Sequence, residues 1–111
     1  MKNVALLTKK KVSTFFSSLA NETRLSILLS LVDGKKSVSG IHEFVGKKRL
    51  SLSAISHQLR FLSNLGVIKN EKIGKERFYE LSEKFCWCVL KDAFNQFGNK
   101  IEIVCKKCCR K

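Results

Sequence analysis

Apolar residues recur every three or four positions in the first third of the chain, a spacing that gathers them on one side of an α-helix. The first set predicts a helix over about residues 8–19: Val12, Phe15, Phe16 and Leu19. The second set repeats the spacing: Leu25, Leu28, Leu29 and Val32. Asn21 suits the start of this second helix and Asp33-Gly34 its end, because asparagine accepts a hydrogen bond from the first turn and glycine terminates helices.

Two further helices are predicted, and each ends at a glycine. In the shorter one Ser39 is the expected cap, Gly46 is the stop, and the inward positions are Ile41, Phe44 and Val45. In the longer one Gly66 is the stop. Its expected buried stripe consists of Leu52, Ile55, Leu59, Leu62 and Leu65.

The pattern then changes to alternation of β-branched or aromatic residues with polar ones. Residues 67–72 and 77–81 alternate in this way around Ile73-Gly74-Lys75-Glu76, which predicts a β-hairpin with a glycine in its turn. A fifth helix is expected to open at Ser82 or Glu83 and to reach about Phe97. It is apolar around so much of its circumference that part of it is expected to pack against a second subunit.

The composition adds a charge argument. The chain has 111 residues, 22 Lys and Arg against 9 Asp and Glu, and a formal net charge of +13. We therefore expect one domain over residues 1–111, with a core at 8–97 and a basic, cysteine-rich tail at 98–111. A hydrophobic content of 44% excludes a disordered polycation. Such a basic domain commonly binds nucleic acid or another anionic surface.

No apolar stretch approaches the roughly 20 residues that a transmembrane helix needs. The N-terminal apolar run precedes its lysines, which is the wrong order for a secretory signal. The sequence therefore predicts a cytoplasmic protein with no membrane partner.

The outward face of the fourth predicted helix is unusual for a merely solvated surface. It carries small or hydrogen-bonding side chains, with one long cation: Ser53, Ser56, His57 and Arg60. Serine costs helix propensity relative to Glu or Lys, but it lets the backbone approach another surface closely. Individually, Ser56 could bond back to its own helix and His57 could be an ordinary surface imidazole. As a set on a basic domain, they favour contact with DNA.

Four helices, a basic hairpin and a fifth helix form the order of a winged helix-turn-helix, a mainly α fold with a small β-hairpin. The residues also resemble a family. LANETRLSIL at 19–28 is similar to the second-helix signature of ArsR/SmtB transcription regulators, SAISHQLRFL at 53–62 to their recognition helix, and residues 66–81 to their wing. The resemblance covers about residues 10–97.

This resemblance implies a homodimeric repressor that places one recognition helix per subunit in the major groove of a palindromic operator. The family's groove contacts fall on Ser53, Ser56 and His57, and we infer a phosphate or guanine contact for Arg60. Expected phosphate contacts in the wing and in the turn before the recognition helix are Lys69, Lys72, Lys75, Arg77, Lys47, Lys48 and Arg49. The expected dimer interface lies on the first and fifth helices: Phe15, Phe16, Val89, Leu90, Ala93, Phe94 and Phe97.

The sequence departs from the family's metal sites. Residues 37–44 lack the cysteine box of the third helix, and the fifth-helix zinc positions are occupied by Glu83, Phe85, Gln96 and Asn99. A phenylalanine cannot ligate zinc, and amides are poor ligands for it. No cofactor is therefore certain.

The remaining chemistry lies in the cysteines. Cys105, Cys108 and Cys109 would share a face in a helical tail, a set of thiolates suited to arsenite, Cd(II) or Zn(II), or to a redox switch. The alternative is that the tail has no sensing role. Cys86 and Cys88 point to different sides of a helix, and they suit small buried residues at an interface as well as sensing.

An enzyme is not expected. The two histidines, His42 and His57, have no cysteine near them in the sequence, and there is no glycine-rich phosphate loop. The alternative function is a winged-helix adaptor that binds a protein or an anionic surface without reading bases, because fold does not fix function.

Overall fold

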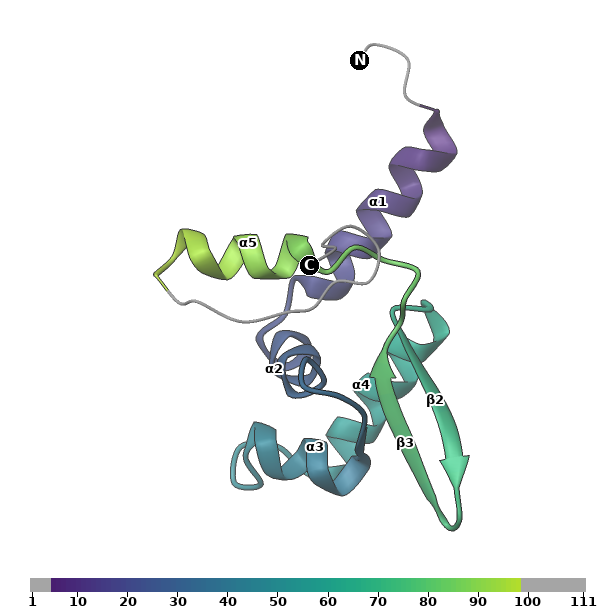
Figure 1. The fold of residues 1–111 in the computed structure, drawn as a ribbon, viewed down its shortest axis with the longest axis vertical. Helices are drawn as coiled ribbons and strands as arrows, with labels where there is room; N and C mark the ends of the chain where they lie inside the picture. The colour runs from purple at the N-terminus through teal and green to yellow at the C-terminus, as the bar shows by residue number, and fades with distance from the viewer. Residues whose placement is uncertain (1–4, 99–111) are drawn as a thin grey trace.

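The computed structural model describes residues 5–98 and confirms the winged helix-turn-helix arrangement (Figure 1). The elements follow in the order α1 (Leu6–Leu19), α2 (Glu22–Ser30), β1 (Lys36–Ser37), α3 (Val38–Val45), α4 (Leu52–Asn64), β2 (Ile68–Ile73), β3 (Glu76–Leu81) and α5 (Cys88–Gln96). In Figure 1 the hairpin of β2 and β3 projects beside α4, while α1 and α5 extend from the opposite end of the molecule.

The core forms where α2, α3 and α4 meet the beginning of the wing. Its fully buried members include Ile27 and Leu28 of α2, Ile41 of α3, and the α4 residues Ile55, Leu59 and Leu62. Val67, Ile68, Trp87 and Leu90 complete it from the wing side and from α5. The i, i+4 and i+7 spacing in α4 therefore does what the pattern predicted, and burial of such side chains stabilises the fold by about 1.5–3 kcal/mol each.

Most helix starts follow from side chains that accept a hydrogen bond from the first turn. Asn21 Oδ1 accepts from the Arg24 N–H at 3.1 Å, as expected. The expected cap of α3 at Ser39 is wrong, because Ser37 Oγ accepts from the Gly40 N–H at 3.2 Å and the helix begins at Val38. Ile41 is buried as predicted, whereas Phe44, also expected inside, is 54% exposed.

The sheet has three antiparallel strands in the order β1-β3-β2, one more than the sequence predicted. Lys36 pairs with Tyr79 and Ser37 with Phe78, so the short strand β1 exists through its distant partner. The turn of the hairpin is shorter than expected, because Ile73 pairs with Glu76 and leaves Gly74 and Lys75 as the loop. Gly74 has a φ of 66°, a conformation that residues with a side chain rarely adopt.

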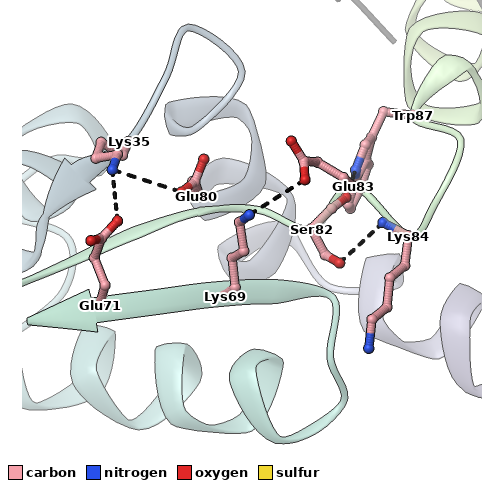
Figure 2. Close-up of polar contacts among 8 residues, drawn as sticks. All are labelled: Lys35, Lys69, Glu71, Glu80, Ser82, Glu83, Lys84 and Trp87. Carbon is pink, nitrogen blue, oxygen red and sulfur yellow. Dashed lines mark hydrogen bonds and ion pairs between the residues drawn. The ribbon is translucent and has the colours of Figure 1, made fainter. Parts of the chain in front are cut away.

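The predicted start of the fifth helix at Ser82 or Glu83 is wrong, since α5 begins at Cys88. Ser82 is occupied by other contacts: its N–H donates to the Val67 carbonyl at 3.0 Å, and its carbonyl accepts from Trp87 Nε1 at 2.8 Å. Its hydroxyl accepts from the Lys84 N–H at 3.2 Å, which forms a tight turn in place of a helix (Figure 2). Competition of this kind is typical of serine at helix boundaries.

Several large apolar side chains of α1, and one at the end of α5, remain in solvent among polar neighbours. Phe15 faces inward and stacks on Phe85 with ring centroids 4.9 Å apart. Val12 and Phe16, expected on the same buried face, are 48% and 51% exposed. At the end of α5, Phe97 is 89% exposed. Over the described residues 5–98, no helix is both long and apolar enough to cross a bilayer.

Candidate nucleic-acid interface

The outward face of α4 carries mostly polar side chains, and the helix contains no carboxylate. Ser53, His57 and Arg60 are exposed and Ser56 is half-buried. The helix begins at a firm cap, because Ser51 Oγ accepts from the Ala54 N–H at 3.1 Å. The predicted groove-reading residues thus lie together on one accessible surface.

Arg24 of α2 fixes the opposite edge of α4. Its Nε donates to Gln58 Oε1 at 3.0 Å, and its guanidinium lies 4.0 Å from the centroid of the Phe61 ring. A further hydrogen bond runs from its NH1 to the Ser17 carbonyl of α1 at 3.2 Å. One side chain therefore joins α1, α2 and α4, and it sets how α4 is presented.

The register of the hairpin sorts the predicted wing cations onto two faces. Successive side chains of a strand point to opposite sides, so Lys72 and its cross-strand partner Arg77 share one face. Arg77 NH1 donates to Asn70 Oδ1 at 2.6 Å, and Asn70 Nδ2 donates to Ser63 Oγ of α4 at 3.2 Å. This face is therefore tied to α4. Two like charges placed directly opposite each other are unfavourable unless an anion neutralises them.

The other face of the hairpin balances its own charge, as Figure 2 shows. Lys35 Nζ lies 2.7 Å from Glu71 Oε1 and 3.9 Å from Glu80 Oε2, and Lys69 Nζ lies 3.5 Å from Glu83 Oε1. The hydrogen bond between Lys35 and Glu71 raises the pKa of Lys35 and lowers the pKa of Glu71 from their ordinary values. Lys69, predicted as a phosphate contact, thus differs from Lys72 and Arg77 in already having an ionic partner.

The remaining predicted cations are exposed at two loops. Lys75 lies at the tip of the hairpin, and Lys47, Lys48 and Arg49 lie in the turn before α4. That turn is held in place by His42, whose Nε2 donates to the Leu50 carbonyl at 2.7 Å.

The predicted interface residues divide between core and surface. Leu90 is 1% exposed and belongs to the protomer's own core, so its assignment to a subunit interface is wrong. Phe15, Val89 and Phe94 are half-buried, whereas Phe16, Ala93 and Phe97 are exposed.

The predicted sensing residues fall mostly beyond the described part of the chain. Cys105, Cys108 and Cys109, with Asn99, lie outside the described residues. Cys86 and Cys88 flank the buried Trp87, and Cys88 takes part in a disulfide. Within residues 5–98, no three His, Cys, Asp or Glu side chains come close enough to hold a metal ion.

Three residues that form or support this surface were not predicted from the sequence. Asn70 occurs two residues before Lys72, so strand alternation alone would have placed it on the same face. Leu52 was assigned to the buried stripe, yet it is 48% exposed. Arg24 gave no signal, because its partners Ser17 and Gln58 lie on other helices.

Known proteins resemble this chain in sequence and in fold. The family model described as "Bacterial regulatory protein, arsR family" matches residues 21–70. The HTH-type transcriptional regulator NmtR of Mycobacterium tuberculosis is 37% identical over 71 residues, which are 64% of this chain and 57% of NmtR. The chain thus spans little more than half the length of that relative.

Two further comparisons extend over more of the chain. The cadmium resistance transcriptional regulatory protein CadC homolog of Staphylococcus aureus is 30% identical over 94 residues, 84% of this chain and 75% of that protein. The structure of HlyU from Vibrio cholerae superposes with a TM-score of 0.74 at 26% identity, covering 86% of this chain and all of HlyU. With this identity and coverage, the chain belongs to the arsR family of bacterial regulatory proteins.

Proposed function

We propose that this protein is a sequence-specific, double-stranded DNA-binding transcription regulator that acts as a homodimeric repressor. The observation that carries the proposal is the continuous surface formed by the acid-free outer face of α4 and the Lys72–Arg77 pair, joined through Ser63 and Asn70. A polar helix can enter the major groove of DNA, and a pair of cations beside it can contact the phosphates that line the groove.

The two parts of this surface have different tasks. Ser53, Ser56 and His57 supply short donors and acceptors to base edges, and Arg60 supplies a guanidinium for guanine or for a phosphate. The cations Lys72, Lys75 and Arg77, with Lys47, Lys48 and Arg49, contact phosphates. They contribute affinity and orientation without reading sequence.

The exposed apolar surface supports dimerisation. Phe16 and Val12 on α1 and Phe97 after α5 leave large side chains in water. In Figure 1 both helices lie away from the tip of the wing. A second copy that covers them would form a two-fold symmetric molecule, and its two recognition helices would read half-sites about one helical turn, roughly 34–36 Å, apart.

We further propose that a thiol-reactive signal releases the repressor from DNA. The arsR-family relative from Staphylococcus is named for cadmium resistance, and cysteine thiolates are suitable ligands for such soft ions. Phe85, at an expected zinc position, stacks on Phe15 inside the protomer, which speaks against a zinc site there.

The proposal is tested by selecting preferred sequences from random duplexes with reduced protein and measuring affinities by fluorescence anisotropy. Ser56→Ala combined with His57→Ala should lower the preference for the selected sequence over a scrambled one by about ten-fold or more, because each base contact contributes about 1–3 kcal/mol. Binding to the scrambled duplex should change little. Ser13→Ala, on the exposed surface of α1, is the control.

Salt dependence gives a second readout. If each subunit neutralises about four phosphates, the log-log slope for the dimer should be about −7. An adaptor that does not read bases would show no selected sequence, and it would lose binding through charge reversals alone. The same anisotropy assay with Cd(II), arsenite or peroxide, and with a variant carrying serine at every cysteine, tests the signal.

A further inference from the structure

Leu52 is the one large apolar residue of α4 that stays exposed in the described structure. Ile55, Leu59 and Leu62 of the apolar stripe have no exposed surface, and Leu65 at its end is partly buried. Leu52 lies one turn before this stripe, at the first position of the helix, and is 48% exposed. About half of this large aliphatic side chain is therefore accessible, and its burial by a bound molecule would be favourable.

The surroundings of Leu52 belong to the proposed DNA surface. Ser53 follows it directly, and Ser56 lies four residues on, which is the nearest neighbour along one side of a helix. The exposed cations Lys47 to Arg49 precede it in the turn. In a helix-turn-helix the N-terminal residues of the recognition helix are those that reach base edges.

Resting on the proposed function, we propose that Leu52 reads thymine by packing against its C5-methyl group in each half-site of the operator. Leucine has no donor or acceptor, so it cannot recognise the polar edge of any base. Thymine is the base that presents an apolar group in the major groove. Leu52 and Ser56 are separated by about 6 Å along the helix axis, so both reach within about two base pairs of each other.

Another exposed apolar side chain, Phe44 of α3, could suggest a protein partner for this region. However, the residues that follow Leu52 on the exposed side of α4 are Ser53, Ser56, His57 and Arg60, which suit a polar groove. The charge of the neighbouring turn is also positive, as a phosphate backbone requires. These features favour DNA as the occupant.

The experiment uses the selected operator and replaces its thymines by deoxyuridine one position at a time. This change removes the methyl group and keeps base pairing. With the wild-type protein, one thymine in each half-site should be sensitive, with affinity falling by about four-fold per methyl group lost. Leu52→Ala should bind the unmodified operator more weakly by at least this factor, and deoxyuridine at the sensitive position should weaken it no further.

Matched controls separate this result from a folding defect. Leu52→Ala should keep the wild-type circular dichroism spectrum and melting temperature, because its side chain is half in water. Ser13→Ala should retain the full sensitivity to deoxyuridine. Leu52→Gln, which can pair with adenine, should shift the preferred base at this position on reselection.

The inference is wrong if no thymine is sensitive, or if Leu52→Ala remains as sensitive to deoxyuridine as the wild type. In both cases a selected operator would still support the proposed function. If the selection yields no preferred sequence at all, the proposed function fails, and the reading of thymine fails with it.

Discussion

Helices α4 and α1 both carry an apolar stripe, but α4 leaves one large apolar side chain in solvent and α1 leaves several. The outward face of α4 carries Ser53, His57 and Arg60, and it continues into the wing through Ser63 and Asn70. Helix α1 leaves Leu6, Leu7, Val12 and Phe16 at least 48% exposed, beside its exposed lysines. The same periodicity therefore gives one helix that is complete in a single protomer and one that is not.

The difference lies in what covers the apolar stripe. Residues of α2, α3 and the beginning of the wing pack around Ile55, Leu59 and Leu62 and bury them. The described structure offers α1 a smaller cover, chiefly the aromatic contact of Phe15 with Phe85 and Trp87. An apolar patch of this kind on a basic domain is typical of an interaction surface.

The largest expected effect is on stability, from the buried stripe of α4. Leu59→Ala should lower the free energy of unfolding by about 2–5 kcal/mol, because the surrounding helices cannot close the cavity. At protein concentrations low enough to keep the chain monomeric, Val12→Ala on the exposed side of α1 should change it by about 0.5 kcal/mol or less. Urea titrations of both variants measure this, and equal losses would mean that the two stripes are covered alike.

The next effect concerns assembly through α1. Phe16→Glu should raise the dissociation constant of the dimer by at least about thirty-fold, since a charge would replace a buried aromatic anchor worth about 2 kcal/mol or more. Sedimentation equilibrium measures the constant, and circular dichroism checks that the fold is kept. Thr14→Glu adds the same charge on another side of the helix and should leave the dimer intact. A wild-type protein that is monomeric at all concentrations would contradict the prediction.

A smaller effect distinguishes the two faces of the wing. Arg77→Ser should reduce the magnitude of the salt slope for DNA binding by about 1.8 in the dimer, one phosphate contact per subunit. Lys69→Ser removes the same charge from the face where Glu83 lies 3.5 Å away, and it should leave the slope nearly unchanged. Anisotropy titrations over a range of salt concentrations test this. Equal changes in the salt slope for the two variants would show that the ion pair of Lys69 does not keep it from contacting phosphate.

The smallest effect is the pH dependence of the Lys35–Glu71 pair. Because Lys35 lowers the pKa of Glu71, the pair stabilises the fold above the ordinary pKa of glutamate, and this contribution is lost as the pH falls through the lowered value. As the pH is lowered from neutral to acidic, the melting temperature should therefore fall slightly more for the wild type than for Glu71→Gln. Glu76→Gln makes the same charge change at the hairpin tip, and its melting curve should follow the wild type. Since the pair is exposed, the difference should shrink in high salt.

Local signals predicted much of the fold and of the site. The apolar spacing located α1, α2 and α4, and the glycine between alternating stretches located the hairpin. The polar residues expected on the outer face of α4 do lie on that face, because the buried stripe fixes the rotation of the helix. Family motifs added the connection between these elements.

Contacts between distant residues explain where those predictions were wrong. Strand β1 depends on pairing with Tyr79 and Phe78, and the late start of α5 depends on Trp87 bonding the Ser82 carbonyl. Periodicity places a residue on a side of a helix, but it does not show how far the neighbouring elements extend over that side. For this reason Leu52 and Phe16 matched the apolar pattern and yet remain in solvent.

Spacing and charge along the chain were thus enough for the type of fold, the reading helix and the basic character of its surroundings, since each is encoded within a few consecutive turns. Packing between elements settled which apolar residues are covered, which wing cations already have partners, and how Arg24 holds α4. These outcomes depend on distances between side chains that are far apart in sequence, and such distances exist only in the folded chain.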